Sequence, residues 1–399
     1  MMKKRRIRIS LGGLWSAVSS LVIAGLGIAL ILFAGLSTHI TGYSEAEVAS
    51  AYEARSISAI LQDPVNLPHK SLTLVYSKIA DDGVIASRMA SATIGAVAII
   101  CLYIATRMWH GKRVAFLVSV LFGTSSWFLL TARSGVPDIS ASLSILVIAL
   151  SAYWMRLHYK NLWSYVALIV ALALVVYVPG MIWLVAVGLL VRGARELRGI
   201  VQSLPRWNLL VLIGLLVLLV VAPIVFAAVR EPRVLLDLLG LPAQLPTITE
   251  AGLNLLHAFL SLFAWHADEL AITIGALPVL DIVTAVFAAL GLYYYWQKRA
   301  LDRTKLLAGA LILAAVLLAL GVTSGYAVLL PVIFFLAAGG MAALLSRWLG
   351  VFPRNPLARA IGLVAITIVV GLACFYNLRA YFVAAPHADN IRSIYSQRE

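Results

Sequence analysis

Long apolar runs separated by short polar stretches organise nearly the whole chain. The runs fall at 14–36, 84–108, 113–131, 138–155, 162–177, 179–191, 207–229, 277–296, 305–322, 326–345 and 358–376. A helix of about 20 apolar residues is long enough to cross the hydrocarbon core of a bilayer. The pattern therefore predicts an all-α polytopic membrane protein with about 11 transmembrane helices, forming a single integral-membrane domain over residues 1–399.

The stretch Thr41–Gly83 is a long exception to this pattern, because it is polar but has helical patterning of its own. Glu45–Leu61 is rich in Ala, Ser and Glu and predicts a helix, and Asp63-Pro64 and Leu67-Pro68 predict a break after it. Beyond the break, apolar residues recur at helical spacing, as expected for an amphipathic helix in the membrane interface: Leu72, Val75, Tyr76 and Ile79. A long loop between two spans is usually functional.

Composition and charge then indicate the class of protein and its orientation in the membrane. Hydrophobic residues make up 62% of the chain and charged residues 12%, against about 25% charged residues in soluble domains. If the N-terminus is cytoplasmic, the cytoplasmic segments hold 21 of the 31 Lys and Arg residues, which is the positive-inside pattern. The net charge of +14 thus indicates topology and contact with anionic membrane lipids rather than nucleic acid. We expect a plasma or inner membrane location with a retained N-terminal signal anchor.

Three outer segments follow from this topology: the loop 40–83, a second loop 230–276 and a C-terminal tail 377–399. Ionisable residues gather on this side, and such residues near a membrane are costly and often functional. They are Glu45 and Glu47, Arg133 and Asp138, and His266, Asp268 and Glu269. The sequence therefore predicts an active site on the extracytoplasmic face. The two cysteines, Cys101 and Cys374, both lie in predicted spans and offer no disulfide framework.

Several of these motifs resemble the membrane glycosyltransferases of the GT-C fold, which include the protein O-mannosyltransferases and the lipid A aminoarabinose transferases. The resemblance rests on the run from Ser44-Glu45 to Pro68, on Ala86–Ser91 with Gly95, and on Ala132-Arg133 followed by Asp138. It covers residues 40–145 and is architectural beyond them. The family usually has Asp-Glu after its first span, where this chain has Ser44-Glu45. Whether Glu45 or Glu47 takes the place of the family's carboxylate is therefore open.

The resemblance implies transfer of a sugar from a polyprenyl-phosphate donor to an acceptor at the outer face, with inversion in a single displacement. A hydroxyl acceptor needs a general base, and Glu45 is the preferred one, with Asp138 in the same site. Lys70, Arg88 and Arg133 would neutralise the lipid phosphate. The acceptor can be a glycan, a lipid or a protein, and the sugar is not specified.

Each assignment has a structural alternative. Glu45, Glu47 and Asp138 also suit the first turn of a helix, where the helix dipole favours carboxylates. Arg133 can pair with Asp138, and Arg88 can pair with Asp81 or Asp82 or extend to the interface.

The remaining candidates are weaker. His69 and Lys70 suit an interfacial helix without any ligand. His266, Asp268 and Glu269 have metal-capable side chains but no diagnostic spacing, so a bound divalent cation is possible in principle and not specified. At the level of function, the alternatives are a polyprenyl-lipid transporter or flippase, which would show broken helices and repeat symmetry, and a non-catalytic lipid-binding relative.

Overall fold

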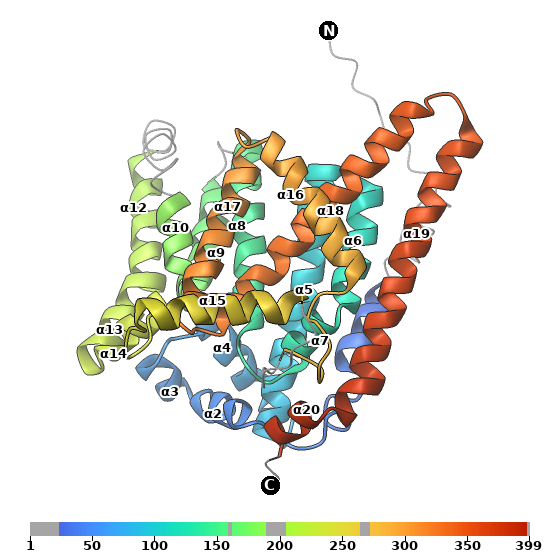
Figure 1. Cartoon of the computed structure of the whole chain (residues 1–399). Coiled ribbons are helices and arrows are strands. Elements are labelled where there is room, and N and C mark those ends of the chain that lie inside the picture. The colour runs from blue at the N-terminus through green and yellow to red at the C-terminus, as the bar shows by residue number, and fades with distance from the viewer. Residues whose placement is uncertain (1–23, 159–161, 189–204, 264–271, 397–399) are drawn as a thin grey trace.

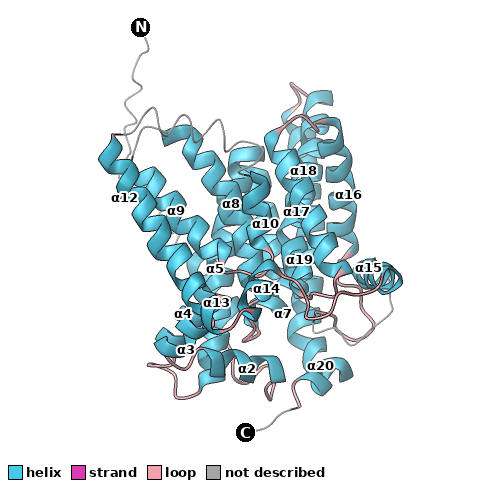
Figure 2. Cartoon of the chain, turned by 90° about the vertical axis from the view of Figure 1, so that its left-hand side faces the viewer, coloured by secondary structure: helices cyan, strands magenta, loops and turns pink. Residues whose placement is uncertain are grey.

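A computed structural model describes residues 24–158, 162–188, 205–263 and 272–396, and within these ranges the secondary structure is helical without β-strands. Long helices run side by side between two ends of the molecule (Figure 1). The short helices α2 (Glu45–Glu53), α3 (Ile57–Gln62) and α20 (Asp389–Ile394) lie at one end. Helix α15 crosses the bundle near the same end, and Figure 2 shows it end-on.

Helices occupy all the predicted apolar runs in the described parts of the chain. After the helix Ala24–Phe33 they are α5 (Gly83–His110), α6 (Lys112–Thr124), α7 (Ser126–Arg133), α8 (Ile139–His158), α9 (Leu162–Val176), α10 (Met181–Gly188), α12 (Arg206–Leu216), α13 (Ala222–Arg230), α16 (Ile282–Gln297), α17 (Asp302–Ala319), α18 (Ser324–Val351) and α19 (Pro356–Arg379).

Four of the described helices are long and apolar enough to cross a membrane: Gly83–His110, Trp207–Arg230, Ser324–Val351 and Pro356–His387. The second of these joins α12 and α13 through a π-helical segment, Val217–Val221. A fifth span results if α6 and α7 are taken together. The all-helical membrane class is confirmed, whereas the total of 11 spans remains a prediction.

The predicted run 113–131 is not one straight helix, which corrects the sequence interpretation. Helices α6 and α7 meet at Ser125 with a bend of 60°. The side-chain oxygen of Asn377 on α19 accepts hydrogen bonds from the backbone N–H and the hydroxyl of Ser126, both at 3.2 Å. The break is thus stabilised by a residue 251 positions away, which hydropathy along the run cannot reveal.

The start of the run at 277 is also wrong, because α16 begins at Ile282. Asp281 is its N-cap and accepts a hydrogen bond from the Thr284 N–H at 2.9 Å. An Asp side chain satisfies an otherwise unpaired N–H group of the first turn. Helix α16 therefore starts at a capping carboxylate and not at residue 277.

The first outer loop forms three helices, α2 (Glu45–Glu53), α3 (Ile57–Gln62) and α4 (Leu67–Tyr76). The predicted break after residue 61 is confirmed, because α3 ends at Gln62 and α4 begins at Leu67 with Pro68 in its first turn. The predicted single helix Glu45–Leu61 is wrong, since it is divided into α2 and α3.

Half of the predicted apolar stripe is exposed, with Val75 55% and Ile79 75% exposed, whereas Leu72 packs against the core of the bundle. His69, Lys70 and Thr73 are buried. The surface of α4 that packs on the protein therefore includes polar residues, and the position of α4 in the membrane interface remains a prediction.

The second outer loop contains α14 (Arg233–Leu239) and α15 (Ile248–Phe263). The predicted start of the tail at 377 is wrong, because α19 continues through a π-helical segment, Ala380–Ala384, and a 3₁₀ turn, Ala385–His387, before α20 (Asp389–Ile394). Backbone hydrogen bonds join these segments to the other loops of the same end. The Asn66 N–H donates to the Tyr177 carbonyl at 2.7 Å, and the Gly180 N–H donates to the Leu238 carbonyl at 3.0 Å. All the predicted outer segments that are described here thus lie at one end, although which membrane face this is remains a prediction.

Helix α18 is the centre of the bundle, and glycines let α16 pack directly on it. A Cβ atom on Gly291 would lie 1.7 Å from the Leu336 carbonyl oxygen, and one on Gly340 would lie 2.1 Å from the Phe287 carbonyl oxygen. Such close approach of helix backbones is typical of small residues in membrane helices.

Candidate active site

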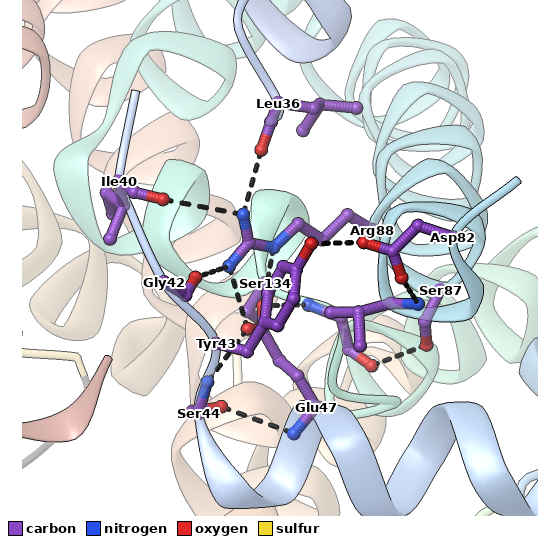
Figure 3. Close-up of polar contacts among 12 residues, drawn as sticks. Leu36, Ile40, Gly42, Tyr43, Ser44, Glu47, Asp82, Ser87, Arg88 and Ser134 are labelled. Carbon is purple, nitrogen blue, oxygen red and sulfur yellow. Dashed lines mark hydrogen bonds and ion pairs between the residues drawn. The ribbon is translucent and has the colours of Figure 1, made fainter. Parts of the chain in front are cut away.

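A buried ion pair between Glu47 and Arg88 lies where α2 meets α5 (Figure 3). The Arg88 Nε donates to Glu47 Oε1 at 2.9 Å, and Nη2 donates to Oε2 at 2.8 Å, so the pair is bidentate. The remaining guanidinium hydrogens reach the carbonyls of Leu36 and Gly42 at 2.9 and 2.8 Å. Both side chains are nearly inaccessible to solvent. Bidentate pairs of this kind are strong and geometrically specific.

The local sequence explains how Glu47 comes to face inward. Ser44 is the N-cap of α2, and its hydroxyl accepts a hydrogen bond from the Glu47 N–H at 3.2 Å. The Ser44 N–H in turn donates to Glu47 Oε2 at 3.1 Å. This capping box fixes the Glu47 carboxylate at the start of the helix. The Ser-x-x-Glu spacing is visible in the sequence, and it could have identified the helix start although not its partner.

The turn between α7 and α8 is fastened to this pair. The Gly135 N–H donates to Glu47 Oε1 at 2.7 Å, and the Ser87 hydroxyl donates to the Gly135 carbonyl at 2.7 Å. The Ser91 hydroxyl donates to the carbonyl of Val136 at 3.0 Å. A Cβ on residue 135 would lie only 3.2 Å from the Glu47 Cγ, so the close approach favours glycine. Ser87 and Ser91 belong to the run that carries the family resemblance, but the sequence assigns no role to them or to Gly135.

Asp138 follows this turn directly and precedes α8. It lies three residues beyond Gly135, so its Cα is within about 11 Å of the Gly135 Cα. Its side chain is half-buried, and burial raises the pKa of the Asp138 carboxyl to about 6. The structure thus brings Asp138 to the same end as the first outer loop.

Glu45 and Glu47 have different surroundings although they are two residues apart. Glu45 is exposed on the first turn of α2, and it forms no ion pair within the described part of the chain. Glu47 is fully buried, and both of its oxygens accept hydrogen bonds. The two carboxylates therefore differ in what they can do: Glu47 holds the structure together, and Glu45 is accessible.

Arg133 is buried but does not pair with Asp138. Its Nη1 and Nη2 donate to the carbonyls of Ile31 and Ala34, at 2.5 and 2.7 Å, at the end of the helix Ala24–Phe33. Its Nε has no hydrogen-bond partner within the described residues. A cation at a helix C-terminus is electrostatically favourable, so Arg133 stabilises the end of the first described helix.

Lys70 and His69 both belong to α4 and lie on its buried side. The Lys70 Nζ forms ion pairs with Asp63 at 2.5 Å and Glu53 at 3.0 Å, and both carboxylates are partly exposed. The His69 Nε2 lies 2.9 Å from the Ser91 hydroxyl. Burial lowers the pKa of His69 to about 4, so this imidazole is neutral near pH 7. Glu53 was not among the sequence candidates.

A small cavity of about 10 Å³, room for about one water molecule, opens beside the Glu47–Arg88 pair. Its walls come from residues 35–40, the ion pair itself, residues 130–134, and Tyr381 with Tyr395. Burial raises the pKa of the Tyr395 phenol, which therefore stays neutral. The two tyrosines were not expected at the site, because nothing in the sequence of the C-terminal segment singles them out.

Three of the sequence candidates cannot be placed. His266, Asp268 and Glu269 lie outside the described residues. Within the described residues, no group of three or more His, Cys, Asp or Glu side chains is arranged to hold a metal ion.

Comparisons with solved structures identify the fold of this protein. No protein-family model matches the sequence, and no curated protein matches it. The structure is similar to that of ArnT from Cupriavidus metallidurans, at a TM-score of 0.54 and 15% identity, over 95% of this chain and 77% of that one. ArnT bound to undecaprenyl phosphate gives a TM-score of 0.55 at 14% identity over the same shares.

A third match is the archaeal oligosaccharyltransferase AglB from Archaeoglobus fulgidus, in complex with an inhibitory peptide and a dolichol-phosphate. Its TM-score is 0.52 at 15% identity, over 98% of this chain and 57% of that one. These likenesses extend over nearly the whole chain, well beyond residues 40–145. The protein therefore has the fold of the GT-C membrane glycosyltransferases.

Proposed function

We propose that this protein transfers a sugar from a polyprenyl-phosphate donor to an acceptor at the outer membrane face. The observation that carries the proposal is the attachment of the 134–138 turn to Glu47, which brings Asp138 and the first outer loop to one end. It occurs in a fold shared with ArnT, whose structure has been solved with undecaprenyl phosphate bound.

Asp138 is the stronger candidate for the general base. A base works best when its pKa is near the working pH, and burial raises the pKa of Asp138 to about 6. Glu47 is unsuited to this role because Arg88 and Gly135 occupy its oxygens. Glu45 is exposed and lies two residues from Glu47, to which the 134–138 turn is attached. It therefore remains the second catalytic carboxylate of the proposal.

The lipid phosphate would meet the cations of the same end. Lys70 is the best placed for direct contact, because its partners Glu53 and Asp63 are partly exposed and can be replaced by a phosphate. Arg88 and Arg133 are held by carbonyls and by Glu47, so their contribution is the positive field around the site. Fixed cations of this kind stabilise the charge that develops on a leaving phosphate.

In this mechanism Asp138 takes the proton from the acceptor, the acceptor oxygen attacks the sugar carbon, and the lipid phosphate leaves. A single displacement inverts the configuration at that carbon. The identity of the sugar and of the acceptor depends on groups that the cavity and its charges do not specify.

The test uses the purified full-length protein in lipid nanodiscs with a panel of radiolabelled polyprenyl-phosphate sugars and candidate acceptors. We expect Asp138→Asn to lower kcat by about 10²- to 10⁴-fold, as for loss of a general base, and Glu45→Gln to lower it less. Glu250→Gln is the matched control, because Glu250 is an exposed carboxylate that caps α15 far along the chain. Equal transfer by all four proteins would contradict the site, and no transfer with any donor would contradict the function.

A further inference from the structure

Arg88 lies close to two aromatic rings that come from opposite ends of the sequence. Its Cζ is 5.4 Å from the ring centroid of Tyr43 and 5.7 Å from that of Tyr395. A guanidinium within about 6 Å of an aromatic centroid is attracted to the ring. Tyr43 belongs to the first outer loop, and its hydroxyl donates to Asp82, the N-cap of α5. Tyr395 belongs to the tail, 307 residues beyond Arg88 in the chain.

Tyr395 reaches this position because α20 is fixed to the end of the bundle. Asn390 accepts a hydrogen bond from the Gly275 N–H at 2.9 Å and donates to the Thr273 carbonyl at 2.9 Å. Ile391, on the same helix, is fully buried. Figure 1 shows α20 and α2 at the same, lower end of the molecule. The tail is therefore packed onto the site and does not extend freely from it.

The C-terminal segment 377–396 also encloses the cavity. Tyr395 is 7% exposed and Tyr381 is 2% exposed, and both line the cavity together with Glu47 and Arg88. The Tyr381 ring centroid is 5.4 Å from the Arg133 Cζ, on the other guanidinium of the cavity. Each buried arginine of the site thus has one tyrosine of this segment against it.

We propose that Tyr395 is a positioning residue, whose ring closes the Glu47–Arg88 pair away from water and thereby holds the 134–138 turn that carries Asp138. The proposal rests on the proposed function for its effect on the reaction. Its physical basis is that an ion pair is stronger and more rigid in a water-free setting. Since Glu47 also accepts from the Gly135 N–H, a loosened pair displaces the turn.

The first arm of the test measures closure without any activity. A Ser134→Cys reporter, placed on the cavity wall, is introduced into a background in which Cys101 and Cys374 are replaced by Ala. A membrane-impermeant maleimide then labels the reporter from the outer face. We expect Tyr395→Ala to increase the labelling rate at least severalfold, whereas Tyr395→Phe, which keeps the ring, leaves the rate unchanged. An unchanged rate in Tyr395→Ala overturns the proposed closure.

The second arm measures turnover of the same variants without the reporter. Displacement of a reacting group by about 1 Å can cost on the order of 100-fold in rate, so we expect Tyr395→Ala to lower kcat by about 10- to 100-fold with little change in the donor KM. Tyr395→Phe should restore kcat. Tyr376→Ala is the control, because Tyr376 precedes the tail on α19 and is 46% exposed.

The two arms of the test distinguish failure of the positioning role of Tyr395 from failure of the proposed transferase function. Faster labelling of Tyr395→Ala with a kcat equal to that of Tyr376→Ala would show that closure does not position the turn, and it overturns the role of Tyr395. Absence of transfer by the wild-type protein with every donor would overturn the proposed function and the positioning role with it, whereas the labelling rates would still decide whether Tyr395 encloses the pair.

Discussion

The two ends of the bundle use their charged groups differently. At the end that carries α2 and α20, three ion pairs occur in the described part of the chain, and they involve Glu47, Arg88 and Lys70. At the opposite end, Arg303 donates to the Trp109 carbonyl at 3.0 Å, and His110 lies 2.6 Å from the Tyr295 hydroxyl. Two N–H groups of the Arg303 guanidinium are thus bonded to a neutral carbonyl and to the Tyr294 phenol.

This difference shows where acid–base chemistry is possible. Carboxylates and cations meet at the first end, around a cavity and a turn with a protonatable Asp138. At the second end, basic and aromatic side chains lie together as expected at the cytoplasmic interface of a membrane protein. The orientation of the two ends in the membrane remains a prediction of the positive-inside pattern. The difference between the ends can be tested by changing one group at each.

The largest effect is expected from Arg88→Met. It leaves the Glu47 carboxylate buried without its cation, and removing one partner of a buried ion pair costs about 3–5 kcal/mol. We expect a large fall in the thermal unfolding temperature in detergent, together with loss of transfer. The double variant Glu47→Gln/Arg88→Met removes both charges and should recover part of the stability. If Arg88→Met unfolds at the wild-type temperature, the pair does not hold this end together.

The pH dependence of turnover is the next prediction. The deprotonated form of Asp138 is the base, and its pKa is raised to about 6, so kcat/KM should be low below pH 6 and rise to a plateau above it. Asp138→Asn should remove this limb along with most of the activity. An identical acid limb in the residual activity of Asp138→Asn would assign the titration to another group.

Lys70→Met should have a moderate effect, mainly on the KM for the polyprenyl-phosphate donor. If the lipid phosphate contacts the Lys70 amine, loss of the cation raises the donor KM by about tenfold, the equivalent of about 1.4 kcal/mol, with a smaller change in kcat. Titration of transfer rate against donor concentration measures both constants. Lys78→Met is the control, since Lys78 is an exposed lysine just after α4. Equal KM values for the two variants would exclude Lys70 from the phosphate site.

The smallest effect is expected at the opposite end. Tyr295→Phe removes the hydrogen bond to His110 but keeps the ring, so stability should fall by only about 1 kcal/mol. The transfer rate should stay at the wild-type level. A loss of turnover comparable to that of Asp138→Asn would mean that the two ends are coupled, which would remove the distinction between them.

Much of the site was accessible from sequence, but the roles within it were not. The apolar runs and the distribution of Lys and Arg predict that Glu45, Glu47, Arg88, Arg133 and Asp138 lie at one end of the molecule. In the structure all five residues lie at the same end. The resemblance favours Glu45, because Ser44-Glu45 stands where the family has Asp-Glu, and it leaves Glu47 open. Glu47 is the residue that binds Arg88. Two carboxylates on one helical turn are equivalent in composition, and only the neighbouring elements distinguish them.

The sequence by itself determined the helical membrane class, most helix positions, the order of the loops and the resemblance to a GT-C transferase. These properties depend on local hydrophobicity and on short motifs, which act within one helix or one turn. The tertiary structure alone decided the bend at Ser125, the pairing of Glu47 with Arg88, the attachment of Gly135 and the enclosure by Tyr395. Each of these joins residues from distant parts of the chain, so no local pattern encodes it.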